Sequence, residues 1–253
     1  MVQPSRSWRL ERNGNTAFVA VAAEFACIAE SSAVTPNGFR HPAWQLVLSA
    51  DAPVTVRDER GVRTAGAGIL VSPGLFRTFT YPAGYVSLWI DPHRLTGPRG
   101  VHALDRSRVT RLLTGLGTDL DPARLRAAVA RTLGPGADLD PRVGRALELL
   151  DGGLPAGQLA ARAGVSPRRF RQLCAQSLGC SLPALRRWHR LRAAVVQLPF
   201  RPAAAVAAGA GFADQSHLVR TTVALGGVTP GALSARWQAI VPESGVGIPI
   251  PKE

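Results

Sequence analysis

The 253-residue chain has only three cysteines, Cys27, Cys174 and Cys180. They are too few and too widely spaced for a disulfide framework or a four-ligand zinc site, and such cysteine usage is typical of a reducing cytoplasm. The chain also lacks an uncharged run of about 18 residues, the length that a membrane-spanning helix needs. We therefore expect a cytoplasmic protein that does not span a membrane.

Acidic residues are scarce. The chain has 17 Asp and Glu against 30 Lys and Arg, all but one of them arginine, which gives a net charge of +13. Residues 152–213 contain nine arginines and no acid. Charge of one sign favours a polyanionic partner, with nucleic acid first and an acidic membrane surface second. Charge alone would fit a sequence-indifferent architectural DNA-binding protein as well as a sequence-specific one.

The first part of the chain has the texture of a β-structure. Short apolar runs alternate with turn residues such as Asn37-Gly38 and Pro73-Gly74. Several short strands at this spacing predict a β-sandwich or a small barrel. The runs expected to be strands are residues 17–23, 44–49, 54–56, 69–71, 76–79 and 85–90.

After residue 92 the apolar positions change to helical spacing. Residue pairs in which an N-cap residue precedes proline predict helix starts at Asp121-Pro122, Asp140-Pro141, Ser166-Pro167 and Thr229-Pro230. Helices are expected near 105–116 and 122–133, followed by a linker at residues 134–136 and an entirely helical remainder. The predicted fold class is therefore α+β.

Residues 156–178 show the pattern of a helix-turn-helix. Small and apolar residues face inward, Gly164 supplies a turn, and Ser166 caps a second helix rich in arginine. Residues 203–225 repeat the pattern around Gly211. Residues 182–198 predict a joining helix of 17 residues, about 25 Å long. Since major grooves recur every ~34 Å along one face of DNA, two recognition helices can reach successive grooves.

Specific motifs run through this region. The clearest are Leu159-Ala160-x-x-Ala163-Gly164-Val165-Ser166, Gly211-Phe212-Ala213-Asp214-Gln215-Ser216-His217-Leu218-x-Arg220 and Gly227-Val228-Thr229-Pro230. In these motifs and their spacing, residues 142–237 resemble the C-terminal domain of AraC/XylS-type transcriptional regulators. The resemblance implies two helix-turn-helix units joined by a long helix, and binding to double-stranded DNA.

Two departures from the family pattern bear on DNA binding. The core phenylalanine usual in each recognition helix is replaced by Cys174 and Thr222, and the basic residues usual after the second phenylalanine are replaced by residues 223–225, Val-Ala-Leu. We therefore expect the second unit to be the weaker DNA reader.

Position within the motifs selects the DNA-binding candidates. In the first unit we expect Arg168, Arg171 and Gln172 to read bases, because arginine matches guanine O6/N7 and glutamine matches adenine N6/N7. In the second unit we expect residues 215–217 to read bases and Arg220 to contact phosphate. The complete expected set is Ser166, Arg168, Arg169, Arg171, Gln172, Arg190, Gln215, Ser216, His217 and Arg220. The arginines of the joining helix are expected on phosphates or in solvent: Arg186, Arg187, Arg190 and Arg192.

The resemblance also implies a cupin-like β-barrel before the DNA-binding domain, and residues 41–46 and 68–74 resemble parts of such a barrel. Metal-dependent cupins need a His-x-His pair with further ligands, which the chain lacks, so no metal, cofactor or catalytic residue is expected. A small-molecule effector can still bind at the barrel mouth, where an arginine would favour an anionic or carbonyl-bearing ligand. The candidates are His41, Trp44, Gln45, Arg77 and Tyr81.

The predicted organisation is a cupin-like sensor barrel at 1–100, a helical dimerisation segment and linker at 101–139, an AraC-type DNA-binding domain at 140–240 and a flexible tail at 241–253. The apolar stripes of 105–116 and 122–133 predict a homodimer, since such helices often carry the dimer contact in this family. The predicted function is sequence-specific transcriptional regulation. A DNA-repair methyl-acceptor protein is disfavoured, because Cys27 alone cannot supply the reactive cysteine within metal-ligand spacing.

Overall fold

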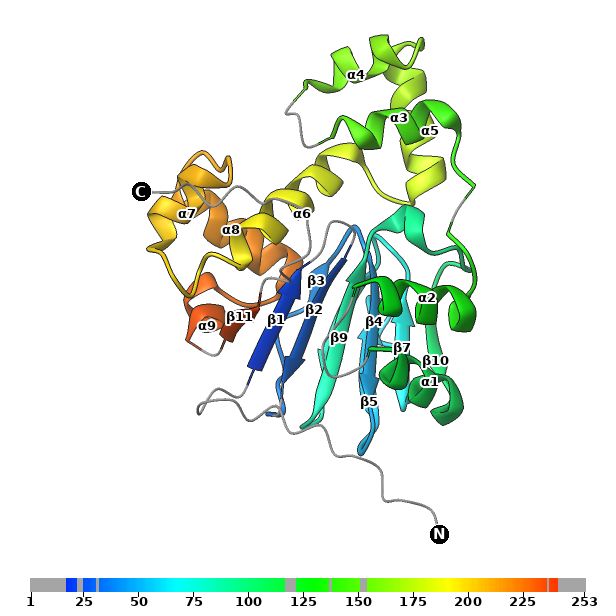
Figure 1. Cartoon of the computed structure of the whole chain (residues 1–253), viewed down its shortest axis with the longest axis vertical. Coiled ribbons are helices and arrows are strands. Elements are labelled where there is room, and N and C mark those ends of the chain that lie inside the picture. Colours follow the sequence, from blue (N-terminus) through cyan, green and yellow to red (C-terminus); the bar gives the residue numbers. More distant parts are fainter. Residues whose placement is uncertain are drawn as a thin grey trace.

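The computed structural model describes residues 17–21, 25–30, 32–116, 122–136, 138–150, 154–235 and 237–240. Its N-terminal part is built from two β-sheets, and helices cover one face and one end of them (Figure 1). The strands are β1 (Ala17–Val21), β2 (Phe25–Glu30), β3 (Phe39–Arg40), β4 (Trp44–Ser49), β5 (Val54–Asp58), β6 (Arg63–Gly66), β7 (Gly68–Val71), β8 (Phe76–Thr80), β9 (Tyr85–Ile90), β10 (Val101–Leu104) and β11 (Trp237–Ile240).

The larger sheet has seven strands in the order β10-β7-β4-β9-β2-β1-β11, and the smaller has four in the order β3-β8-β5-β6. The named strand pairs are antiparallel except for β1 with β11, which is parallel. Alternation along β4 places Gln45 and Val47 between the sheets and turns Leu46 and Leu48 to the opposite face. We call the part formed by β1–β10 the β-domain.

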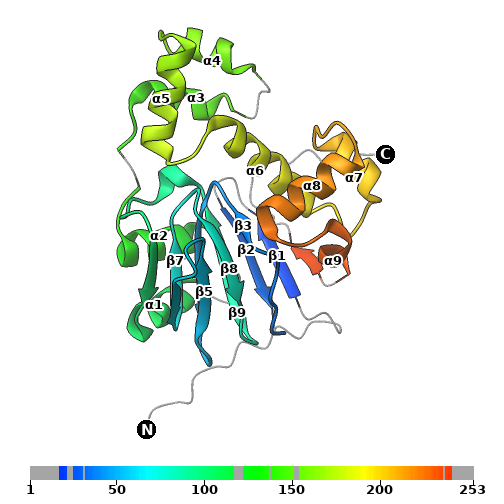
Figure 2. The ribbon, with the colours of Figure 1, turned by 180° about the vertical axis from the view of Figure 1, so that it is seen from behind.

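Helices α1 (Arg106–Leu116) and α2 (Pro122–Leu133) cover the outer face of the larger sheet, on the side opposite the four-stranded sheet (Figures 1 and 2). Val109, Leu112 and Leu116 of α1 pack there against Leu46 and Leu48. Both helices lie where the apolar stripes predicted them. The 3-10 helix η1 (Pro92–Arg94) follows β9.

The C-terminal part contains α3 (Pro141–Glu148), α4 (Ala156–Arg162), α5 (Pro167–Leu178), α6 (Leu182–Val195), α7 (Ala203–Gly209), α8 (Gln215–Gly226) and α9 (Pro230–Ser234). The predicted starts at Asp140, Ser166 and Thr229 are confirmed, since each of these side chains accepts a hydrogen bond from a backbone N–H of the first turn. The predicted start at Asp121 lies outside the described residues.

The structure corrects two predictions for this half. The prediction of an entirely helical remainder is wrong at β11, whose backbone pairs with β1 at the edge of the larger sheet. The joining helix α6 has 14 residues instead of 17, about 21 Å, because the chain leaves the helix after Val195 and continues in turns. Residues 241–253, the predicted tail, lie outside the described residues.

The cores of the two parts are continuous. One apolar cluster contains Ala43 and Trp89 of the β-domain together with Phe170, Trp188 and Leu218 of the helical part. Helix α6 lies across one end of the sheets and connects the two groups of helices (Figures 1 and 2). The helical part is therefore seated on the β-domain through shared apolar burial.

Candidate nucleic-acid interface

The first helix-turn-helix unit consists of α4 and α5. Gly164, at φ +68°, makes the turn between them in a backbone conformation that favours glycine. Phe170 and Cys174 turn inward and are each 1% exposed. The opposite side of α5 leaves Arg168 and Arg171 in solvent, together with Arg169 and Gln172. These four predicted DNA-binding side chains therefore share one exposed surface at the start of α5.

The side chain of Ser166 makes a hydrogen bond within its own helix. Its hydroxyl accepts a hydrogen bond from the backbone N–H of Arg169 at 3.2 Å and so caps α5. Gln176, which the sequence reasoning missed, is exposed one turn beyond Gln172. The i, i+4 spacing was the available signal, since residues so spaced lie on one helix face.

The second unit consists of α7 and α8. Asp214 caps α8 by accepting from the backbone N–H of His217 at 2.6 Å, and Gln215 and Ser216 are exposed beside it. His217 is half-buried against the Phe212 ring, with the ring centroids 5.3 Å apart. Its Nδ1 accepts from the backbone N–H of Ala213 at 3.4 Å. In the neutral imidazole the proton then lies on Nε2, which can donate to a ligand.

A surface groove of about 460 Å³ lies between α6 and α8. The groove is lined by Arg187 of α6 and by His217 and Arg220 of α8, together with Ala213, Thr221 and Ala224. Two guanidinium groups and an imidazole line this groove without a carboxylate. Such a set of donors suits a phosphate oxygen.

The arginines of α6 differ in their surroundings. Arg190 is exposed, as predicted. The Arg186 guanidinium donates to the backbone carbonyl of Leu154. The prediction that Arg192 contacts phosphate or remains solvated is wrong, because Arg192 is 6% exposed and its Nη1 lies 3.1 Å from Oδ1 of Asp91 in the β-domain. A cation on the inner face of α6 needed a partner to be buried.

Three of the five ligand candidates meet between the two sheets. Arg77 Nε donates to Gln45 Oε1 at 3.0 Å, and Gln45 Nε2 donates to the Tyr81 hydroxyl at 3.0 Å. Ser87, which the sequence reasoning did not single out, joins them as a second acceptor for Gln45 Nε2 at 3.1 Å. The network links both sheets, so no single strand pattern revealed it.

Arg77 is a buried cation with 0% exposure. Burial lowers the pKa of Arg77 to about 9, which leaves the group protonated at pH 7. It donates from Nη1 to the Leu75 carbonyl at 2.9 Å and lies 5.0 Å from the centroid of the Phe39 ring. Its Nη2 finds no hydrogen-bond partner among the described residues.

The other two candidates lie elsewhere. The Trp44 ring packs on the outer face of the larger sheet with the α1 residues and donates from Nε1 to the Pro92 carbonyl at 3.3 Å. His41 is 2% exposed, and its ring centroid lies 4.4 Å from that of Trp188 of α6. Burial, and then the charge of Arg77, hold the pKa of His41 well below its usual value.

Two features are absent from the described residues. Among these residues, no helix is long and apolar enough to cross a membrane. The same part of the chain contains no group of three or more His, Cys, Asp or Glu side chains arranged to hold a metal ion.

Comparison with known proteins identifies the domain and the fold. Residues 159–236 match a family model described as a helix-turn-helix domain, and no curated protein matches the sequence. An apo variant of ToxT from Vibrio cholerae is 12% identical, with a TM-score of 0.57 over 85% of this chain and 98% of ToxT. ToxT from the same organism with an unsaturated fatty acid bound is 11% identical, with a TM-score of 0.52 over 89% and 97%.

The chain therefore contains a helix-turn-helix domain after a β-sheet domain, and its fold is that of ToxT. The matched residues 159–236 include the motifs around Gly164 and Gly211, in which the sequence resembles AraC/XylS-type regulators.

Proposed function

We propose that the protein is a sequence-specific regulator that inserts the N-terminal ends of α5 and α8 into successive major grooves. The observation that carries the proposal is the exposure of hydrogen-bonding side chains at both helix starts, Arg168 and Arg171 with Gln172 in one and Gln215 with Ser216 in the other. Helix α6 separates the two units by 14 helical residues, and this spacing is compatible with adjacent groove segments.

The roles of these residues follow from their chemistry. Arg168, Arg171 and Gln172 read base edges in the first unit. In the second unit, Gln215 and Ser216 remain base readers. His217, together with Arg220 and Arg187, contacts a phosphate in the groove between α6 and α8, because these three donors line one groove.

The test is selection of bound duplexes from a random DNA pool, followed by salt titration of the selected site against scrambled DNA. We expect a selected motif with two spaced elements. The protein should still prefer this motif over scrambled DNA at moderate salt, because base contacts discriminate between sequences independently of counterion release. Uniform and salt-sensitive affinity for all sequences would favour a sequence-indifferent architectural protein instead.

We further propose that a carboxylate-bearing small molecule controls the protein through Arg77. A carboxylate suits this buried guanidinium, whose Nη2 has no hydrogen-bond partner in the described part of the chain, because it can accept in bidentate geometry. The solved structure of ToxT with an unsaturated fatty acid supports an acidic effector in a protein of this fold.

Thermal unfolding in the presence of fatty acids of graded length tests this proposal. A ligand of the folded state raises the midpoint with concentration, and the rise should be absent in Arg77→Met. Arg40→Met is the matched control, because Arg40 is exposed and pairs with Glu59 at the surface. Equal shifts in both variants would contradict a role for Arg77.

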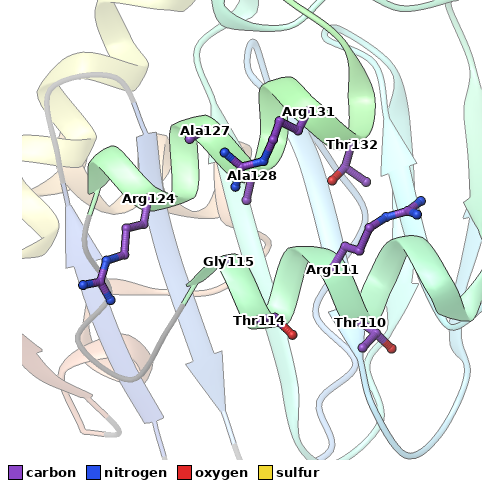
Figure 3. Close-up of a pocket in the computed structure, with 9 residues that line it drawn as sticks. All are labelled: Thr110, Arg111, Thr114, Gly115, Arg124, Ala127, Ala128, Arg131 and Thr132. Atoms are coloured by element: carbon purple, nitrogen blue, oxygen red, sulfur yellow. The ribbon is translucent and has the colours of Figure 1, made fainter.

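We also propose a homodimer through α1 and α2. A groove of about 730 Å³ lies between these helices. Figure 3 shows Ala128 of α2 pointing toward Gly115 at the end of α1. The close approach of Gly115 to Ala128 leaves no room for a larger residue at position 115. The residues around the groove are available to a second copy of the chain.

A further inference from the structure

The β-domain contacts both recognition helices at their C-terminal ends. The C-cap of α5, Gly179, lies so close to Gly74 that a Cβ on Gly74 would be 3.3 Å from the Gly179 carbonyl oxygen. The C-cap of α8, Gly227, accepts a hydrogen bond at its carbonyl from the backbone N–H of Asn37 at 3.3 Å. The expected reading ends of both helices are the opposite ends, so they project away from these contacts.

A third contact joins the β-domain to α6, between the two units. Asp91 directly follows β9 and is 1% exposed. Its Oδ1 accepts from Trp188 Nε1 at 2.9 Å and from Arg192 Nη1 at 3.1 Å. Its Oδ2 lies 3.2 Å from the same Nη1 and 3.3 Å from His189 Nε2. The three partners occupy one side of α6, where residues at i and i+4 lie together.

The carboxylate of Asp91 makes its hydrogen bonds to side chains of α6. Although Asp91 is the N-cap of η1, its side chain makes no capping hydrogen bond there. Burial alone would raise the pKa of Asp91, but the Arg192 charge and the hydrogen bonds from His189 and Trp188 outweigh it and lower the pKa below its usual value. The group is therefore ionised at neutral pH, and removal of its charge leaves the buried Arg192 guanidinium uncompensated.

Helix α6 contacts the recognition helix of each unit, α5 at one end and α8 at the other. Figures 1 and 2 both show it between the two groups of helices and above the ends of the strands. The Asp91 contact thus fixes the middle of the assembly, and the Gly74 and Asn37 contacts fix its two sides.

We propose that Asp91 is a positioning residue for DNA recognition, which holds the two recognition helices in one relative position by seating α6 on the β-domain. This inference rests on the proposed function, because it assumes that both helices bind one DNA molecule. Once one helix is bound, binding by the second is intramolecular, and its strength depends on how well the second helix is placed in advance.

The test compares the full chain with Asp91→Asn, which keeps the shape of the side chain and removes its charge. Asp51→Asn is the matched control, because it removes the same charge from an exposed position of the β-domain. Affinities are measured for a selected two-element duplex, for a duplex with one element scrambled, and for duplexes with the spacing between elements changed by one or two base pairs.

We expect Asp91→Asn to lose about tenfold in affinity for the two-element duplex, to bind the one-element duplex as the wild type does, and to tolerate altered spacing better. Asp51→Asn should retain the wild-type ratios. Equal losses of affinity for the two-element and one-element duplexes would show only a smaller active fraction and would overturn the proposal. Unchanged or increased affinity for the two-element duplex would overturn it as well. If Asp91→Asn does not fold, Trp188→Phe replaces it, since it removes only one donor to Asp91 and should shift the same ratio less.

Hydrogen exchange without DNA separates this proposal from the proposed function. Loss of the Asp91 contact should accelerate exchange in α6 and in the C-terminal turns of α5 and α8. Unchanged exchange in these segments would overturn the inference, whatever DNA the protein binds. Accelerated exchange, in a protein whose wild type selects no DNA sequence, would support the positioning role of Asp91 and contradict sequence-specific binding.

Discussion

Thr222 occupies in α8 the position that Cys174 occupies in α5. Each lies eight residues after the N-cap of its helix, Asp214 or Ser166, and each is 1% exposed. The Thr222 hydroxyl donates to the Leu218 carbonyl one turn earlier at 2.8 Å. Two small side chains therefore fill core positions at which the resembled family places phenylalanine.

We expect Cys174→Phe to destabilise the protein even though it restores the usual residue of the family. A larger side chain in a core packed around a smaller one forces neighbours off their rotamers, which costs about 1–3 kcal/mol. Urea unfolding measures the change, and Cys174→Ala serves as the comparison without added volume. An unchanged midpoint for Cys174→Phe would mean that the core around α5 has spare volume.

Arg171→Ala and Arg187→Ala should weaken DNA binding in different ways. Loss of a base contact by Arg171 should cost about 1–3 kcal/mol and relax the preference at one base step, whereas loss of a phosphate contact by Arg187 should weaken all sequences alike and reduce the salt slope by about one. Salt titrations on a selected site and its single-base variants measure both quantities. His217→Ala should resemble Arg187→Ala. A relaxed base preference in Arg187→Ala would contradict its phosphate role.

Stability should fall on mild acidification because of His41. The folded-state pKa of His41 is depressed by burial, whereas the unfolded chain takes up a proton near pH 6.5. Its contribution is therefore complete above pH 6.5 and is lost as the pH falls from there, by up to about 1.4 kcal/mol per pH unit. Urea unfolding from pH 7.5 to 5 measures this dependence.

The His41→Asn variant provides the comparison for this pH dependence. An asparagine oxygen can replace Nδ1 as the acceptor for the Ala43 backbone N–H, and it does not titrate, so the slope should flatten. Identical slopes in wild type and His41→Asn would contradict the prediction.

The proposed dimer should become tighter as salt is added. Helices α1 and α2 contain six arginines and no acidic residue, and a two-fold contact brings the same side chains of both copies together. Salt reduces this repulsion because the Debye length falls from about 10 Å at 0.1 M to about 3 Å at 1 M. Sedimentation at several salt concentrations measures the dissociation constant. Arg131→Glu should tighten the dimer at low salt. A protein that is monomeric at every salt concentration would contradict the proposed dimer.

Local signals in the sequence predicted many of the strands and helices. Strands β4 and β9 and helices α1, α2 and α5 lie where short apolar runs, apolar stripes and caps placed them. Strands β2, β3, β6 and β10 were missed. Strand β3 has two residues and β6 contains no large apolar residue, so neither carries a pattern of its own, and pairing with neighbouring strands supplies their stability.

The sequence by itself determined the two helix-turn-helix units, because capping residues, turn glycines and inward small residues act within a few positions of one another. It also determined the charge that suits a polyanion. Only the tertiary structure decided which arginines are available to DNA. Asp91 lies 101 positions before Arg192 in the chain. The contact between the two side chains buries Arg192 against the β-domain. The network of Arg77, Gln45 and Tyr81 likewise depends on two sheets that meet in space, and a buried charge finds its partner only in the folded chain.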